Sequence, residues 1–345
     1  MYCPRINHFV RLHSSGNIGK CGHMINGKGF KTFKQLDQSQ WLNRIRTQMI
    51  FDEWPDECQR CQETEKIDGE SIRTKSIERH KVLHPKHKEY LVVGGVLDNV
   101  CNSACQTCGP RWSTKIGSLE SKKYMRVNNL DVFYKLPQRR ILEIDVNGGE
   151  PTASKNYKKL ISNVPKNTKI VRMNTNGARM INELIPLLEK GIMVIVTLSF
   201  DGVGNVHDYV RWPILWKNYT KTIDRYLKLK EKYKLLKLNL WTTVSALNIL
   251  DFDNIIAFAK KKNIVHAYGL LHEPDAVNVK YKNKFTLEAK GKLQHEIKKH
   301  IATTKDNSEQ LDLFIKKQDY LRKININDYL SFLPNLLKNN SAKAK

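Results

Sequence analysis

The sequence lacks the long apolar stretches that membrane-spanning and exported proteins carry. No part of its 345 residues approaches the roughly 20 consecutive apolar residues that cross a bilayer. The first residues, from Met1 to Arg5, contain no apolar stretch of the kind found in a signal peptide. We therefore expect a cytoplasmic protein that does not contact membranes.

Several common catalytic motifs are also missing. The chain contains no Walker-type phosphate loop, no G-x-S-x-G nucleophile elbow and no H-E-x-x-H zinc helix. The sequence therefore argues against a P-loop nucleotide hydrolase, an α/β-hydrolase and a zinc protease of the common type.

Acidic residues are scarce relative to basic ones. The 34 Asp and Glu residues face 59 Lys and Arg residues, which gives a formal charge of +25. Such a charge favours polyanionic partners, nucleic acid included. The lysines are scattered, however, and form no compact basic and aromatic patch. A compositional bias of the source explains the charge equally well, and both interpretations stay open.

Cysteines are few, and their arrangement is informative. Seven cysteines cannot pair completely, and a cytosolic chain is not expected to build a disulfide framework. They divide into an early group, Cys3, Cys21, Cys58 and Cys61, and a later group, Cys101, Cys105 and Cys108. The later group has the spacing C-x3-C-x2-C. Three thiolates are one fewer than a closed zinc or iron–sulfur site uses, so we expect a substrate or cofactor to be the fourth ligand.

The length exceeds that of a usual single domain and predicts several segments. Residues 1–70 are predicted to form a small, loop-dominated, cysteine-rich module. A metal held by its four cysteines would stabilise so small a module, and the spacing suits zinc and an iron–sulfur cluster equally. Residues 71–88 are predicted to be a linker, residues 89–275 the main domain, and residues 276–345 a helical extension.

From Tyr90 onward, short β-rich runs alternate with helical patterns. This alternation predicts an α/β fold built around parallel strands. Six such units predict a partial (β/α)6 TIM-like barrel rather than a closed one. The predicted strands run from Leu91 to Leu97, Ile141 to Val146, Lys169 to Asn174, Met193 to Ser199, Lys237 to Val244 and Val265 to Leu271.

Polar or thiolate groups follow four consecutive predicted strands. Besides the cysteines after the first strand, they include Gly148, Gly149, Glu150, Pro151, Asn176, Ser199, Asp201 and Arg211. In parallel α/β folds this end of the strands carries the ligands. Glycines can let a ligand approach the backbone, and a carboxylate can receive an ammonium group. Each motif alone also suits an ordinary turn, so the repetition is what favours a binding site.

Together these residues resemble the radical S-adenosylmethionine superfamily. The resemblance implies that Cys101, Cys105 and Cys108 ligate a [4Fe-4S] cluster whose fourth iron is chelated by S-adenosylmethionine. The sequence G-G-E-P at residues 148–151 matches the motif that receives the amino group of this cofactor. Asn176 and Ser199 match polar positions that contact its carboxylate or ribose. Thr107 departs from the family, in which an aromatic residue usually precedes the third cysteine and covers the adenine.

The resemblance extends to members with an auxiliary cluster. Ser199-Phe-Asp201-Gly202 with Arg211 is similar to a stretch of members that carry SPASM or twitch domains, and we assign Asp201 and Arg211 to the cofactor site on that basis. The early cysteine group resembles a twitch domain placed at the N-terminus. This implies a second [4Fe-4S] cluster at Cys3, Cys21, Cys58 and Cys61, with zinc as the alternative.

The activity implied by the resemblance is reductive cleavage of S-adenosylmethionine. The resulting 5′-deoxyadenosyl radical would abstract a hydrogen atom from a substrate, which we expect to be a peptide or protein side chain. The electron would come from a low-potential donor such as flavodoxin or ferredoxin. Two alternatives stay open: radical modification of a nucleotide, nucleic acid or sugar, and a non-enzymatic metal-binding interaction protein. The sequence names no catalytic acid or base.

Overall fold

The chain divides into two compact units. The computed structural model describes residues 1–83, 89–120, 124–293, 296–301 and 305–330. The first unit comprises Met1–Val100, Arg126–Met173 and Glu183–Val194, and the second comprises Cys101–Met125, Asn174–Asn182 and the chain from Ile195. The domain boundaries at residues 70, 88 and 275 stay predictions, and residues 84–88 of the expected linker lie outside the described residues.

The strands form a mostly parallel sheet with the hydrogen-bonded order β2-β1-β3-β4-β5-β6-β7-β8. They are β1 (Phe9–Leu12), β2 (Ile18–Gly19), β3 (Leu91–Asp98), β4 (Ile141–Gly148), β5 (Ile170–Thr175), β6 (Met193–Ser199), β7 (Leu236–Val244) and β8 (Val265–Leu270). Strands β3 to β8 match the six predicted strands. The order is linear within the described residues, so the sheet is open. The predicted α/β fold with a partial barrel is confirmed.

Strand β1 adds to this sheet from the predicted N-terminal module. It pairs in parallel with β3, with Val10 opposite Val93, and antiparallel with the short strand β2. Part of residues 1–70 therefore belongs to the main sheet rather than to an irregular, loop-dominated segment. Four residues are too few to show the alternation that identifies a strand in a sequence.

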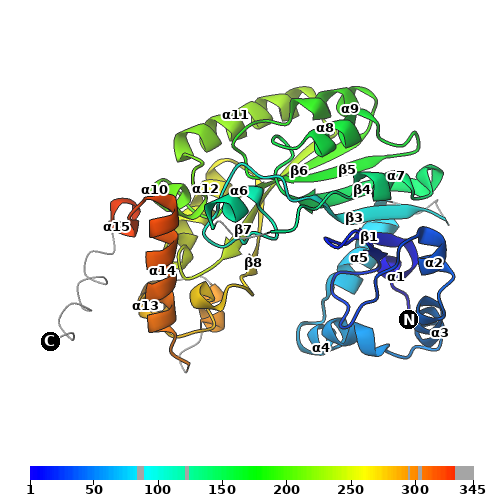
Figure 1. Cartoon of the computed structure of the whole chain (residues 1–345), viewed down its shortest axis with the longest axis horizontal. Coiled ribbons are helices and arrows are strands. Elements are labelled where there is room, and N and C mark those ends of the chain that lie inside the picture. Colours follow the sequence, from blue (N-terminus) through cyan, green and yellow to red (C-terminus); the bar gives the residue numbers. More distant parts are fainter. Residues whose placement is uncertain (84–88, 121–123, 294–295, 302–304, 331–345) are drawn as a thin grey trace. The chain divides into compact units, whose positions relative to one another are not determined.

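Short helices surround the strands of the first unit (Figure 1). They are α1 (Pro4–His8), α2 (Phe33–Asp37), α3 (Gln40–Ile50), α4 (Gln59–Asp68), α5 (Ile72–Leu83), α7 (Leu130–Tyr134), α8 (Lys155–Ser162) and α9 (Ile185–Glu189), with 3-10 turns at Asp56–Cys58, Gln138–Arg140 and Asn182–Leu184. The hydroxyl of Ser39 accepts a hydrogen bond from the backbone N–H of Leu42, which caps α3. Helix α3 buries Leu42, Ile45 and Met49, which lie on one face of the helix.

The second unit packs helices against β7 and β8 (Figure 1). Its helices are α6 (Thr114–Leu119), α10 (Asn205–Val210), α11 (Trp216–Lys232), α12 (Phe252–Lys261), α13 (Lys284–Lys292), α14 (Ser308–Arg322) and α15 (Ile326–Tyr329), with 3-10 turns at Ile249–Asp251, Asp275–Val277 and Glu296–His300. In β7, Leu236, Leu238 and Leu240 are buried, whereas Lys237 and Trp241 are exposed. This period of two shows that one face of the strand is covered.

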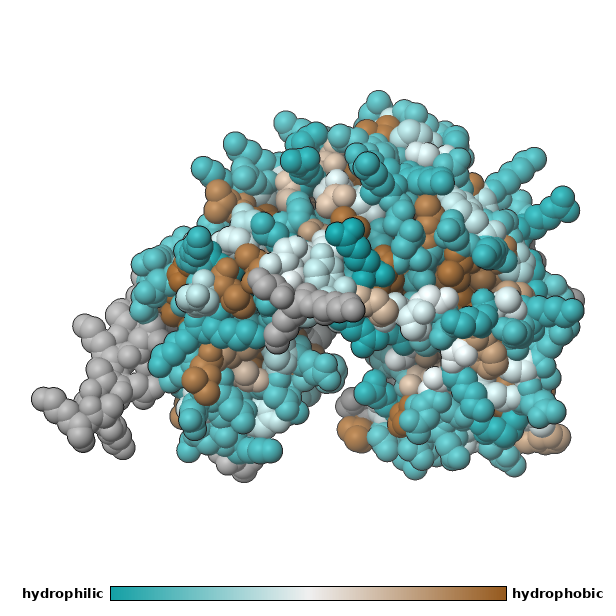
Figure 2. Space-filling model, viewed as in Figure 1, coloured by the Kyte–Doolittle hydropathy of each residue, from teal (hydrophilic) through white to brown (hydrophobic). Residues whose placement is uncertain are grey.

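The face of the molecule drawn in Figure 2 is largely hydrophilic. The face drawn in Figure 2 shows apolar side chains only in small separate groups. Ile50 and Phe51, at the end of α3, are 76% and 72% exposed. Among the described residues, every helix is too short or too polar to cross a membrane.

Candidate functional site

The three-cysteine loop, residues 101–108, is fixed by backbone hydrogen bonds within the second unit. The N–H of Cys101 donates to Oγ1 of Thr114 at the start of α6 (3.1 Å). The N–H of Ala104 donates to the carbonyl of Trp212, and that of Gln106 to the carbonyl of Val210, each over 2.8 Å. The loop is therefore held between α6 and the segment that follows α10.

The thiols of this loop lie close to one another. The sulfur atoms of Cys101 and Cys105 lie 3.3 and 3.7 Å from the hydroxyl oxygen of Ser103. Burial, together with the neighbouring thiols of Cys105 and Cys101, raises the pKa of Cys108 to about 12. Since a metal ligand must be a thiolate, binding here would release protons and would weaken at low pH.

Asn176, which follows β5, contacts the three-cysteine loop. Its Nδ2 donates to Oδ1 of Asn102 (2.8 Å) and to Oγ of Ser103 (3.2 Å). Asn176 is 5% exposed and Ser103 is 2% exposed. The structure therefore brings one predicted polar residue from a strand end directly to the predicted metal ligands. Asn102 and Ser103 were not singled out from the sequence, although their place between the cysteines could have indicated them.

Asp201 and Arg211 form a buried ion pair near the same loop. Nη1 of Arg211 donates to Oδ2 of Asp201 (3.0 Å), and the N–H of Thr243 donates to Oδ1 (2.8 Å). Burial raises the pKa of Asp201, and Arg211 offsets part of that effect. Burial acts to lower the pKa of Arg211, but its electrostatic interactions with Cys105 and Asp201 raise it overall. The carboxylate of Asp201 therefore holds Arg211 beside the cysteines. Ser199 is half-buried at the last position of β6.

The G-G-E-P motif belongs to the first unit, where β4 ends. Gly148 has φ +135°, and a Cβ atom there would lie 2.0 Å from the carbonyl oxygen of Asp98. A Cβ atom on Gly149 would lie 2.0 Å from the carbonyl oxygen of Val100. In the structure, the missing side chains of these two glycines therefore let the backbone carbonyls of Asp98 and Val100 come close to them.

Glu150 and Pro151 complete this motif and are both buried. Glu150 is 1% exposed, and its Oε1 accepts hydrogen bonds from the N–H (3.1 Å) and the hydroxyl (2.8 Å) of Thr152. Its own N–H donates to the carbonyl of Val100 (2.7 Å). The carboxylate is thus held in one orientation at the end of β4. Its predicted role in binding an amino group stays a prediction.

The four early cysteines line one cavity of the first unit. Cys3, Cys21, Cys58 and Cys61 share this pocket with the apolar side chains Ile6, Met24, Met49, Trp54 and Ile72, and with Arg5, His23, Glu57 and Arg73. Burial raises the pKa of Cys3 to about 11 and that of Cys58 to about 12, and the neighbouring thiols contribute to both shifts. Nε of Arg5 donates to the sulfur of Cys21 (3.2 Å). Four thiols in a largely apolar cavity are a donor set that suits a thiolate-ligated metal group.

The metal assignments themselves stay predictions. Among the described residues, no three His, Cys, Asp or Glu side chains are arranged so that they could hold a metal ion. The structure therefore brings each group of cysteines into one region without forming a coordination geometry.

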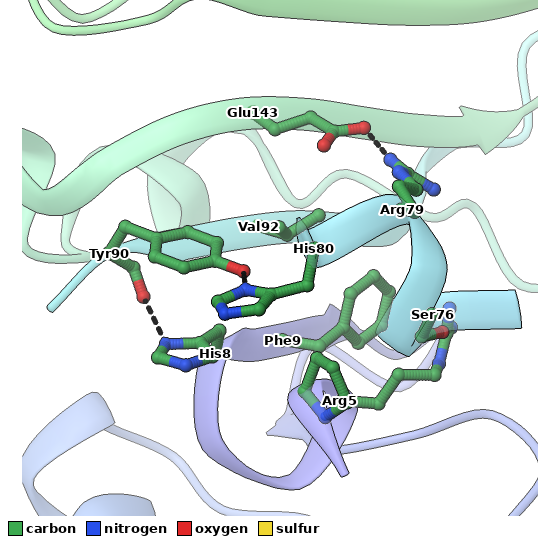
Figure 3. Close-up of a pocket in the computed structure, with 10 residues that line it drawn as sticks. Arg5, His8, Phe9, Ser76, Arg79, His80, Tyr90, Val92 and Glu143 are labelled. Carbon is green, nitrogen blue, oxygen red and sulfur yellow. Dashed lines mark hydrogen bonds and ion pairs between the residues drawn. The ribbon is translucent and has the colours of Figure 1, made fainter. Parts of the chain in front are cut away.

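A second pocket of the first unit lies between α1, α5 and the strands. Figure 3 shows the rings of His8, His80 and Tyr90 close together, with the His8 and Tyr90 centroids 4.2 Å apart and nearly parallel. Burial lowers the pKa of His8 to about 4. The charged and polar groups pair across the pocket, Arg79 with Glu143 and His80 with the Tyr90 hydroxyl. We interpret this pocket as a packed junction between these elements.

His207 is a buried histidine beside the Asp201 and Arg211 pair. It is fully buried, its ring lies 4.4 Å from that of Tyr219, and neither ring nitrogen has a hydrogen-bond partner among the described residues. Burial, and secondarily Arg211, lowers its pKa to about 3. The folded protein therefore keeps His207 neutral under conditions that protonate it in the unfolded chain.

This environment predicts an acid-sensitive stability. The unfolded chain binds a proton at His207 below a pH of about 6.5, whereas the folded chain does not until about pH 3. As pH falls through this window, the free energy of unfolding should decrease by up to about 1.4 kcal/mol per pH unit. His207→Phe should flatten this dependence in urea unfolding measured across the window. His272→Asn, on an exposed side chain, is the control. An unchanged slope in His207→Phe would show that other groups cause the acid sensitivity.

The fold and the site together define a class: an open α/β sheet with a three-thiol loop after a central strand. No protein-family model matches the chain. Over 116 residues it is 27% identical to mycofactocin maturase MftC of Mycolicibacterium smegmatis, a match that covers 33% of this chain and 29% of that protein. The chain thus matches less than a third of that relative's length.

Solved structures show distant likeness. SuiB of Streptococcus suis bound to S-adenosylmethionine is 10% identical, with 87% of this chain and 71% of that chain covered and a TM-score of 0.44. The structure of anSMEcpe with bound AdoMet is 16% identical, with 68% and 62% covered and a TM-score of 0.40. At these scores the likeness carries no argument about function.

Proposed function

We propose that this chain is a radical S-adenosylmethionine enzyme. The observation that carries the proposal is the three-cysteine loop, in which the thiols of Cys101 and Cys105 lie beside Ser103 and which Asn176 contacts from the end of β5. Three thiols without a fourth protein ligand suit a [4Fe-4S] cluster that leaves one iron open. The sequence match to a maturase supports the same class.

In this proposal Cys101, Cys105 and Cys108 hold the cluster. When bound, the cluster supplies the electron that cleaves S-adenosylmethionine, and the protein positions and shields the reacting groups. The amide of Asn176 is fixed by its bonds to the loop and by the N–H of Ala178, which donates to its Oδ1 (3.0 Å), and Asn176 is proposed to contact the cofactor there. Arg211, held by Asp201, places a positive charge beside the thiolates. Glu150, with Gly148, Gly149 and Pro151, is proposed to receive the amino group, and Ser199 to contact the cofactor.

The test is product formation under anaerobic conditions. Purified protein reconstituted with iron and sulfide, then given dithionite and S-adenosylmethionine, is expected to form 5′-deoxyadenosine, detected by mass spectrometry. Absence of this product from protein that has bound iron would falsify the proposed activity.

The early cysteines are proposed to hold an auxiliary cluster of the twitch type. Their shared, largely apolar cavity supports this proposal. Cys58→Ala should lower the iron content by about four per chain, because one [4Fe-4S] cluster is lost. Iron and zinc should be measured together by plasma mass spectrometry after reconstitution. Loss of zinc with unchanged iron would assign the group to zinc instead.

The proposed substrate is a peptide or protein side chain. This proposal rests on the matched relative, which is named a maturase. A flavodoxin or ferredoxin is the proposed electron donor. A short peptide encoded beside the gene should change in mass when it is incubated with the protein, S-adenosylmethionine and reductant. If 5′-deoxyadenosine forms but the mass of the peptide does not change, other substrate classes should be tested.

A further inference from the structure

Arg322, the last residue of α14, reaches the three-cysteine loop from the C-terminal part of the chain. Its Nε donates to the carbonyl of Ala104 (2.8 Å) and its Nη2 to the carbonyl of Cys105 (3.4 Å). Arg322 is only 4% exposed. No motif in the sequence connects it with the cysteines, from which more than 200 residues separate it.

We propose that Arg322 is a positioning residue for the three-cysteine loop, and that its charge makes the metal group held there easier to reduce. This inference rests on the proposed function, because it assigns a role toward the cluster that the loop would hold. It concerns residues of this chain that no family motif includes.

The positioning role follows from the hydrogen bonds on the two sides of the loop. The N–H group of Gln106 donates to the carbonyl of Val210, the last residue of α10, and that of Ala104 to the carbonyl of Trp212 just beyond it. The carbonyls of Ala104 and Cys105 instead accept from Arg322. The peptide groups around Cys105 are therefore held from both directions. Without Arg322, the buried carbonyl of Ala104 would lose the donor that Arg322 supplies, which is costly. The carbonyl of Cys105, which also accepts from the N–H of Cys108 (3.2 Å), would lose one of its donors.

Hydrogen bonds anchor the end of helix α14, so the backbone of Arg322 is held in place. Oδ1 of Asp319 accepts a hydrogen bond from the Tyr209 hydroxyl on α10 (2.9 Å). Its Oδ2 accepts from the N–H of Ile326, the first residue of α15 (2.9 Å). The first bond ties the end of α14 to α10, whose C-terminal end holds the loop, and the second ties α14 to α15.

The proposed effect of the Arg322 charge follows from the groups that accept its hydrogen bonds. Its hydrogen-bond acceptors among the described residues are neutral: the carbonyls of Ala104, Cys105 and Gln318 and the Gln318 side-chain oxygen. Arg211, by contrast, is paired directly with Asp201. A buried positive charge is weakly screened. It favours the more negative, reduced form of a thiolate-ligated cluster, since net charge sets the potential of such groups.

The experiment compares three variants of the full chain after anaerobic reconstitution. Arg322→Gln removes the charge and one of the two donating arms. Arg322→Lys keeps the charge but cannot reach two carbonyls as a fork. Lys316→Gln removes an exposed charge from the same helix and is the matched control. The electron paramagnetic resonance signal that disappears in Cys105→Ala identifies the cluster to be followed in redox titrations.

Arg322→Gln is expected to lower the ratio of reduced to oxidised cluster at a fixed potential about tenfold, which is about 59 mV for a one-electron couple. Arg322→Lys should stay close to the wild-type potential. Both should speed amide hydrogen exchange in residues 101–113, because the loop loses its fixed donor. Lys316→Gln should change neither measurement.

The outcomes separate this inference from the proposed function. If Cys105→Ala removes no iron and no signal, the proposed function fails. If that cluster is present and Arg322→Gln matches the wild type in both potential and exchange, the inference alone is wrong. If Arg322→Gln does not fold, Arg322→Lys decides, because wild-type exchange in residues 101–113 would exclude the positioning role. A potential shifted equally in Lys316→Gln would exclude a specific charge effect.

Discussion

Replacing Cys105 with alanine is expected to reduce 5′-deoxyadenosine formation to background. Cys105 is the most buried of the three thiols in its loop, at 6% exposed, and its backbone carbonyl is held by Arg322. The proposed cluster would lose one of its three thiolate ligands, and the two thiols that remain are too few to hold it. The measurement is product formation per chain over time, after reconstitution under identical conditions.

The same variant should keep the metal of the early cysteine group. The proposed iron site at Cys3, Cys21, Cys58 and Cys61 lies in a pocket that Cys105 does not line. Ser103→Ala is the matched control, because it removes a hydroxyl beside the thiols but leaves all three sulfur atoms. It should keep measurable product formation. Undiminished cleavage in Cys105→Ala would mean that the reactive group is held elsewhere.

Replacing Gly149 with alanine is expected to destabilise the first unit by about 3 kcal/mol. The added Cβ would lie 2.0 Å from the carbonyl oxygen and 2.5 Å from the carbonyl carbon of Val100. Backbone atoms cannot move aside as a flexible side chain can. The N–H of Glu150 also donates to this carbonyl, so a shift would break that hydrogen bond. Urea unfolding followed by circular dichroism measures the loss.

Gly291 in α13 provides the contrasting substitution. A Cβ atom there meets nothing within 4 Å. Gly291→Ala should therefore leave the protein unchanged or stabilise it by about 0.5–1 kcal/mol, since alanine favours a helix. Wild-type stability in Gly149→Ala would show that the ends of β3 and β4 have more room than the structure gives them.

The six central strands could be predicted because each is a compact run of apolar residues followed by turn residues. In β3, for example, Leu91, Val93 and Leu97 are buried, and they lie within one short apolar segment of the sequence. Strand β1 could not be predicted in this way, because four residues next to histidines and asparagines give no clear period. Its place follows from its pairing with β3, which is a long-range contact.

Site residues that belong to a local sequence motif could be predicted, whereas a residue that reaches the site from a distant part of the chain could not. The thiols and Asn176 carry recognisable residue types at strand ends, and the structure places Asn176 on the loop. The sequence predicts that Gly148 and Gly149 admit a ligand, and this stays a prediction. The structure shows that both glycines let two chain segments pack closely. Arg322 had no local pattern, since only the fold brings α14 to the loop.

Because Arg322 holds the loop, the order in which the chain is synthesised determines when the loop can gain these hydrogen bonds. The three cysteines are synthesised about 200 residues before Arg322, which at 5–20 residues per second is roughly 10–40 s. During that interval the Arg322 donors to the carbonyls of Ala104 and Cys105 have not yet been synthesised. The loop therefore gains these hydrogen bonds only after synthesis has passed residue 322.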